Sequence, residues 1–159
     1  MIFYFKIKIY IKLNMCYIKT RRQAESQNQE DEIEINKKHQ LFLDIAAETA
    51  KYSTMQQKHG AVVVHKNKVI ACGFNYTTHF LNDNNSIHAE VAAITQVLKN
   101  KNILNECDIY VVRIAPQRFN NCLKMSKPCD KCTRFIKKYN IRKTYYSTNY
   151  EYDYNYLNI

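Results

Sequence analysis

Residues 108–114 read DIYVVRI, a run of β-branched and aromatic residues that predicts a strand. Upstream, the runs AVVVH (61–65) and KVIACG (68–73) flank Lys66-Asn67, and this pattern predicts a strand hairpin. Downstream, residues 141–146 predict a last strand. These four runs are the expected strands of one sheet.

The segments around these strands have helical spacing. Apolar residues recur at intervals of three and four from Gln40, and similar patterns cover residues 88–98 and 129–139. Polar stretches at 75–85 and 116–127 are predicted as loops. The order helix, strand, strand, helix, strand, helix, strand predicts an α/β fold with a sheet between helices and parallel crossovers in its second half.

The two ends of the chain differ from this central part. Residues 1–38 are expected to comprise a segment that alternates like a strand, followed by a polar flexible linker, and we assign them no function. The domain proper is expected over residues 39–147. Residues 148–159 form a Tyr-rich C-terminal tail, and its alternating tyrosines are compatible with an edge strand or a disordered end.

Composition excludes several classes of protein. Only two glycines occur among 159 residues, which rules out Gly-rich loops that bind phosphates or dinucleotides. No stretch of about 18 apolar residues is free of charge, so no membrane span is expected. The formal net charge is +10, and ten basic residues face one acid, Asp130, between Arg113 and Lys143. This basic segment (residues 113–143) predicts contact with phosphate, possible nucleic acid included, although a Lys-rich composition also contributes to it.

Two short clusters carry side chains suited to metal chemistry. His88-Ala89-Glu90 opens one predicted helix, and Pro128-Cys129-Asp130-Lys131-Cys132 opens the next. A Cys-x-x-Cys pair alone also fits a redox dithiol or half of a zinc knuckle. Together, His88, Cys129 and Cys132 supply one nitrogen and two sulfurs, an ordinary ligand set for Zn²⁺. Helix starts at one end of a sheet lie together and favour thiolates, so we predict a zinc site.

The number of ligands separates a catalytic zinc site from a structural one. A structural site is closed by four protein ligands, whereas a catalytic site keeps a position for water. Three ligands are evident here, and Glu90 is better placed beside the metal, where a carboxylate can move a proton. Cys122 is the one residue that could close the site, which would make it structural.

The sequence resembles the cytidine and deoxycytidylate deaminase family, which is zinc-dependent. The similarity extends over about residues 40–147, and its centre is the H-x-E…P-C-x-x-C signature. It is carried by HGAVVV (59–64), ACGFN (71–75), SIHAE (86–90), SKPCDKC (126–132) and KTYYS (143–147).

This resemblance implies a fold and a set of site residues. The expected fold is a three-layer α/β/α cytidine-deaminase-like fold with a central mixed sheet. By similarity, His88, Cys129 and Cys132 bind zinc, and Glu90 is the catalytic proton shuttle. The backbone amides of Ala89 and Cys129 would help to hold the base, and Asn75 matches the position that hydrogen-bonds the sugar.

Three functions fit these observations. The favoured one is hydrolytic deamination of the cytosine base of a free nucleotide, with dCMP giving dUMP and ammonia. The alternatives are deamination of a base in RNA or DNA, such as a tRNA adenosine, and a zinc-stabilised binding module without turnover. The Lys127 before Pro128 differs from the Glu-Pro-Cys run usual in tRNA adenosine deaminases. The resemblance implies a homo-oligomer. We expect the protein in the cytoplasm, since thiolate ligands require a reducing compartment.

Overall fold

The computed structural model describes residues 32, 34–80, 83–116, 122–150 and 153–158. The chain divides into two compact units, Met1–His39 and Gln40–Ile159. The strand-like pattern expected over the first 18 residues lies outside the described residues. Residues 34–38, expected within a flexible linker, are helical instead. An ion pair of 2.8 Å between Lys38 and Glu34, one helical turn apart, supports this helix.

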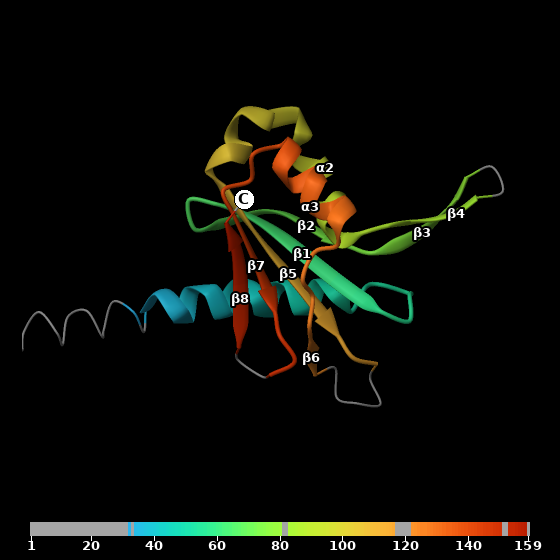
Figure 1. Cartoon of the computed structure of the whole chain (residues 1–159), viewed down its shortest axis with the longest axis horizontal. Helices are drawn as coiled ribbons and strands as arrows, with labels where there is room; N and C mark the ends of the chain where they lie inside the picture. The colour runs from blue at the N-terminus through green and yellow to red at the C-terminus, as the bar shows by residue number, and fades with distance from the viewer. Residues whose placement is uncertain (1–31, 33, 81–82, 117–121, 151–152, 159) are drawn as a thin grey trace, which may run out of the picture. The chain divides into compact units, whose positions relative to one another are not determined.

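The second unit is built on a six-stranded mixed sheet (Figure 1). Its strands along the sheet are β2 (Lys68–Phe74), β1 (Lys58–His65), β5 (Cys107–Ile114), β7 (Lys143–Ser147) and β8 (Tyr154–Asn158), with β6 (Leu123–Lys124) paired to the end of β5. The pairing between β5 and β7 is parallel, and the other pairings are antiparallel. Lys66 and Asn67 both have positive φ, as the tight turn of the β1–β2 hairpin requires.

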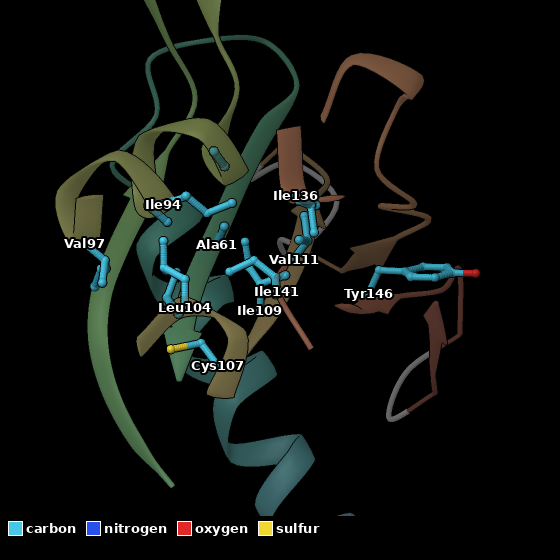
Figure 2. Packing of buried hydrophobic residues seen from close by; sticks show 14 residues of the cluster. Ala61, Ile94, Val97, Leu104, Cys107, Ile109, Val111, Ile136, Ile141 and Tyr146 are labelled. Atoms are coloured by element: carbon cyan, nitrogen blue, oxygen red, sulfur yellow. The ribbon is translucent and has the colours of Figure 1, made fainter. Parts of the chain in front are cut away.

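Helices cover both faces of this sheet. Residues 40–50 form a helix on one face, whereas α2 (Ala89–Val97), the 3₁₀ segment η1 (Leu98–Glu106) and α3 (Asp130–Lys138) lie on the other. Alternate residues of the central strands feed the two hydrophobic clusters, because successive strand side chains point to opposite faces. Figure 2 shows the α2–α3 side, where Ile94 and Ile136 approach Ala61 and Val111. The predicted three-layer arrangement is confirmed.

Both glycines of the chain lie where a strand meets a helix at short range. A Cβ atom at Gly60 of β1 would lie 2.6 Å from the amide nitrogen of Ala50. A Cβ atom at Gly73 of β2 would lie 2.7 Å from the carbonyl oxygen of Ala89, the first residue of α2. Neither position has room for a side chain, so these glycines set how closely the layers approach.

The two predicted loops and the C-terminal tail all contain strands. The predicted loop at 75–85 contains a second, two-stranded sheet, β3 (Tyr76–Phe80) and β4 (Asp83–Ile87), which projects from the main sheet in Figure 1. Its Thr- and Asn-rich strands lack the alternation of apolar residues by which buried strands are recognised. The short strand β6 lies in the second predicted loop, and the Tyr-rich tail contributes β8 as an edge strand.

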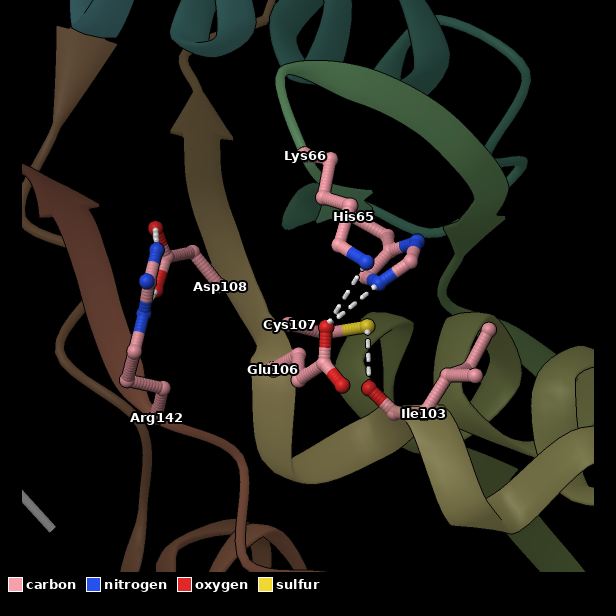
Figure 3. A network of polar contacts seen from close by, with 7 residues as sticks. All are labelled: His65, Lys66, Ile103, Glu106, Cys107, Asp108 and Arg142. Carbon is pink, nitrogen blue, oxygen red and sulfur yellow. Dashed lines mark hydrogen bonds and ion pairs between the residues drawn. The ribbon is translucent and has the colours of Figure 1, made fainter.

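A group of charged side chains at the opposite end of the sheet from the first residues of α2 anchors β5 (Figure 3). His65 and Lys66 contact the Glu106 carboxylate at 3.1 and 3.2 Å. The guanidinium of Arg142 donates two hydrogen bonds of 2.9 and 2.7 Å to the carboxylate of Asp108, which is 7% exposed. The contact between Arg142 and Asp108 has the planar two-bond geometry that makes arginine–carboxylate pairs strong.

We expect Arg142→Ala to lower the free energy of unfolding by about 2 kcal/mol, because it leaves a buried carboxylate without its cation. This loss is smaller than for a fully buried pair, since the guanidinium itself is largely exposed. Urea unfolding of both proteins measures the difference. Arg142→Lys should lower the free energy of unfolding less, because lysine keeps the positive charge and loses only the paired hydrogen bonds of the guanidinium. Equal stability of Arg142→Ala and the wild type would contradict this prediction.

Thr144 of β7 is fully buried, and its Oγ1 has no hydrogen-bond partner among the residues that the structure describes. Valine has nearly the same shape and removes the unsatisfied hydroxyl. We therefore expect Thr144→Val to raise the free energy of unfolding by about 1 kcal/mol. Thermal unfolding would show this as a higher Tm, and a lower Tm would show that the hydroxyl is satisfied in solution.

Candidate functional site

The candidate ligands lie where α2 and α3 begin. His88 is the N-cap residue of α2, and Cys129 is the N-cap residue of α3; both have extended backbone conformations. Neither side chain bonds an amide of its own helix. Cys132 follows Cys129 by three residues, so both sulfurs face the same side of the first turn. The local backbone thus places three potential ligand atoms at the N-terminal ends of two helices.

These three side chains meet at one point. The His88 Nδ1 atom lies 3.2 Å from the Cys132 Sγ atom and 3.7 Å from the Cys129 Sγ atom. The three ligand atoms all lie within 4.8 Å of one another. Tetrahedral zinc with bonds of about 2.0–2.3 Å separates neighbouring ligand atoms by about 3.5 Å. Both the spacing and the one-nitrogen, two-sulfur donor set therefore fit zinc.

Burial distinguishes the two thiols. Cys132 is buried and Cys129 is exposed. Burial raises the pKa of the Cys132 thiol, and the carboxylate of Glu90 raises it further. A buried thiol of this kind is deprotonated when it binds a metal cation, so the site suits a divalent ion better than an empty thiolate pair.

Glu90 lies beside these ligands and outside the metal-binding group. It is 4% exposed, and it lines the same pocket as His88 and Cys129. Burial raises the pKa of its carboxyl, opposed by its own backbone N–H group and by His88 and Cys132. Cys122, the residue that could have closed the site, is exposed and is not part of the group within the described residues. Three protein ligands with a buried carboxylate at their side can bind a metal and move a proton.

A pocket of about 630 Å³ opens in front of the metal-binding group. Its walls come from the loop before β1, the base of the β3–β4 hairpin, the first turn of α2 and the loop before α3. Besides the predicted site residues, it is lined by Met55, Gln56, Gln57, His59, Thr77, Ser86, Ser126 and Lys127. The volume is typical of a small-molecule site.

Asn75 lines this pocket as predicted for a substrate contact, but its amide also binds the chain. Its Oδ1 atom accepts a 2.8 Å hydrogen bond from the backbone N–H of His59, and its Nδ2 atom donates one of 2.7 Å to the carbonyl of Gln57. Asn75 therefore holds residues 57–59 at the pocket wall. Ala89 is buried at the first turn of α2, next to His88.

A buried pair of serines, which the sequence did not reveal, positions the segment that carries Cys129 and Cys132. Ser126 Oγ donates to the carbonyl of Val111 at 2.8 Å and lies 2.9 Å from Ser147 Oγ. The Ser147 hydroxyl donates in turn to the carbonyl of Lys124 at 2.7 Å. These bonds tie the loop before Cys129 to β5 and β7. The motifs SKPC and KTYYS contained both serines, but a single sequence does not reveal that they meet.

Comparison with known proteins places the chain among zinc enzymes. Residues 36–148 match the family model described as "Cytidine and deoxycytidylate deaminase zinc-binding region". No curated protein matches the chain. Among the described helices, none has the length and apolar character needed to cross a membrane.

Solved structures share the fold at low sequence identity. The dCMP deaminase from the cyanophage S-TIM5, in apo form, is similar with a TM-score of 0.55 and 21% identity, over 69% of this chain and 82% of that one. A cytidine deaminase from Burkholderia pseudomallei is similar with a TM-score of 0.58 and 19% identity, over 76% of this chain and 91% of that one. Since the family model covers most of the chain and includes all three potential zinc ligands, the chain belongs to the cytidine and deoxycytidylate deaminase family.

Proposed function

We propose that this protein is a zinc-dependent hydrolytic deaminase that acts on the cytosine base of a free nucleotide, converting dCMP and water into dUMP and ammonia. The observation that supports it best is the presence of His88, Cys129 and the buried Glu90 on the wall of one pocket, with Cys132 behind them. A site with three protein ligands and an adjacent carboxylate suits catalysis better than structure.

The roles of the residues follow from their positions. When bound, zinc supplies Lewis acidity that makes a water molecule nucleophilic near neutral pH. Glu90 would take the two protons of this water one after the other, and would deliver the first to the ring nitrogen N3 and the second to the departing amino group. Its burial keeps the carboxyl out of bulk solvent, and its own pKa is raised toward the range in which a group both accepts and donates protons.

The backbone and Asn75 would orient the substrate. The amides of Ala89 and Cys129 belong to helix ends, where N–H groups lack intrahelical acceptors and can bind the base or the reacting centre. Asn75 holds the pocket wall through residues 57–59 and would contact the sugar from there. We propose these residues, together with the three zinc ligands and Glu90, as the active site.

One observation favours a second candidate, a base in RNA or DNA. On α3 the side chains of Lys131, Arg134, Lys137 and Lys138 are exposed. Several separated cations suit an extended phosphate backbone. We rank this reading second because Lys127, rather than Glu, precedes Pro128. We further propose a homo-oligomer in a reducing compartment such as the cytoplasm, consistent with free cysteines among the described residues.

Ammonia release from a substrate panel tests the proposal. The zinc-loaded full chain would be incubated with dCMP, CMP, deoxycytidine, guanine and a tRNA. We expect dCMP to be the best substrate, with turnover only mildly dependent on salt. A polynucleotide substrate would show affinity that falls steeply between low and physiological salt. Absence of ammonia from every member of the panel would support the binding module instead.

A further inference from the structure

Three basic residues form a row across neighbouring strands, and one of them, His59, lines the pocket. In the sheet register, His59 of β1 pairs with Arg113 of β5, and Arg113 in turn pairs with Lys124 of β6. Residues paired in this way have their side chains on the same face of the sheet, with Cβ atoms about 5 Å apart. The row therefore brings three potential cations side by side on three adjacent strands.

This row faces the side of the sheet that carries the active site. His59 has the same parity along β1 as Ala61 and Val63, which pack in the cluster with α2. His59 itself lines the pocket, and so does Lys127 on the loop before α3. Burial lowers the pKa of His59, its hydrogen bond to Gln57 opposes this, and the charges of Arg113 and His88 lower it further, so the imidazolium form is disfavoured unless an anion is bound.

No carboxylate in the described part of the chain forms an ion pair with these side chains. Among the described residues, the ion pairs involve other cations: Lys38, Lys51, His65, Lys66 and Arg142. Arg113, Lys124 and Lys127 have no side-chain hydrogen bond or ion pair within the described part of the chain. Arg113 is only half-exposed, so water solvates its guanidinium incompletely.

Such an arrangement is unfavourable unless an anion is present. Like charges directly opposite each other on paired strands destabilise a sheet, and a partly buried arginine without a carboxylate lacks compensation. A phosphate group supplies both the opposite charge and the paired acceptors that a guanidinium binds best. The Nδ1 atom of His59 lies 3.3 Å from the carbonyl oxygen of Gln57, so Nε2 would donate to a phosphate oxygen only when the imidazole is protonated, a form that a bound anion favours.

We propose that His59, Arg113 and Lys124, with Lys127 at the pocket wall, form an anion subsite that binds the terminal phosphate of a mononucleotide substrate. This proposal rests on the proposed function, and it names the residues that would make the enzyme prefer a nucleotide to a nucleoside. The row spans three adjacent strands, about 10 Å, and long side chains at this spacing can converge on a single phosphate group. The exposed cations of α3 lie outside it.

Equilibrium binding tests this subsite without requiring turnover. Isothermal titration calorimetry on the zinc-loaded full chain would compare dUMP with deoxyuridine, which differ only in the phosphate. We expect dUMP to bind about 10- to 100-fold more tightly. Arg113→Gln should remove most of this ratio while leaving the affinity for deoxyuridine unchanged. Arg113→Lys should keep part of the ratio, because it retains the charge without the fork.

Matched variants show where the effect arises. Arg134→Gln removes an exposed arginine of α3 outside the row, and it should leave the dUMP-to-deoxyuridine ratio intact. Lys124→Gln, at the outer end of the row, should reduce the ratio less than Arg113→Gln. Circular dichroism and zinc content would confirm that each variant is folded and loaded.

The outcomes separate this proposal from the proposed function. An unchanged ratio in Arg113→Gln, or no preference for dUMP, would overturn the subsite even if ammonia release is observed. An Arg113-dependent preference for dUMP would support the subsite even if no nucleotide is deaminated. A single-stranded oligonucleotide that binds through both Arg113 and Arg134, with dUMP binding no tighter than deoxyuridine, would overturn it in favour of a polymer.

Discussion

Glu90→Gln is expected to reduce ammonia release by about 10²- to 10⁴-fold, the usual contribution of a positioned acid–base group. The amide has nearly the same size as the carboxyl but cannot accept and return a proton. Because Glu90 is buried beside the ligands and is not one of them, zinc content should stay near that of the wild type. Ammonia release and metal analysis on the same preparation measure both quantities.

Glu48→Gln provides the matched control, since Glu48 is an exposed acid of the helix over residues 40–50 that pairs with Lys51. This variant should retain full turnover. Full activity in Glu90→Gln would rule out Glu90 as the proton shuttle. Loss of zinc together with activity would instead assign Glu90 to the metal site.

Cys132→Ala should remove zinc binding and, with it, all turnover. Cys132 is the buried ligand and lies 3.2 Å from the Nδ1 atom of His88. Without its sulfur, only His88 and Cys129 would remain to bind the ion. We expect zinc to fall from about one ion per chain to a small fraction of that value. The Tm should also fall, because a metal that binds only the folded state stabilises it.

Cys72→Ser is the control for this second prediction. Cys72 is an exposed thiol of β2 and does not belong to the metal-binding group. It should keep both zinc and activity. Removal of zinc from the wild type with a chelator should reproduce the lower Tm of Cys132→Ala. Wild-type zinc content in Cys132→Ala would mean that another residue supplies the third ligand.

The parts of the fold that were predictable are those in which burial imposes a pattern on the sequence. β1 and β5 are rich in β-branched residues because both of their faces pack against helices. The β3–β4 hairpin was missed for the converse reason: Thr77 and Ser86 are exposed, and strands without a buried face carry no apolar alternation.

The site divides in a similar way. Zinc chemistry restricts ligands to a few residue types, so the metal-binding group could be proposed from His88 and the Cys-x-x-Cys pair. The row of His59, Arg113 and Lys124 could not be proposed in this way, because it depends on the register between β1, β5 and β6. Nothing in a single sequence states which residue of one strand lies opposite which residue of another.

Gly73 has a consequence for any attempt to redesign this protein. The backbone of α2 rests directly on β2 at this point, and the same helix begins with His88 and Glu90. Even one added methyl group would collide with the backbone of this helix, and the resulting shift of the helix would displace His88 and Glu90 relative to the cysteines. Residue 73 offers no reactive atom, and yet it is a position that mutagenesis libraries aimed at new substrates should leave untouched.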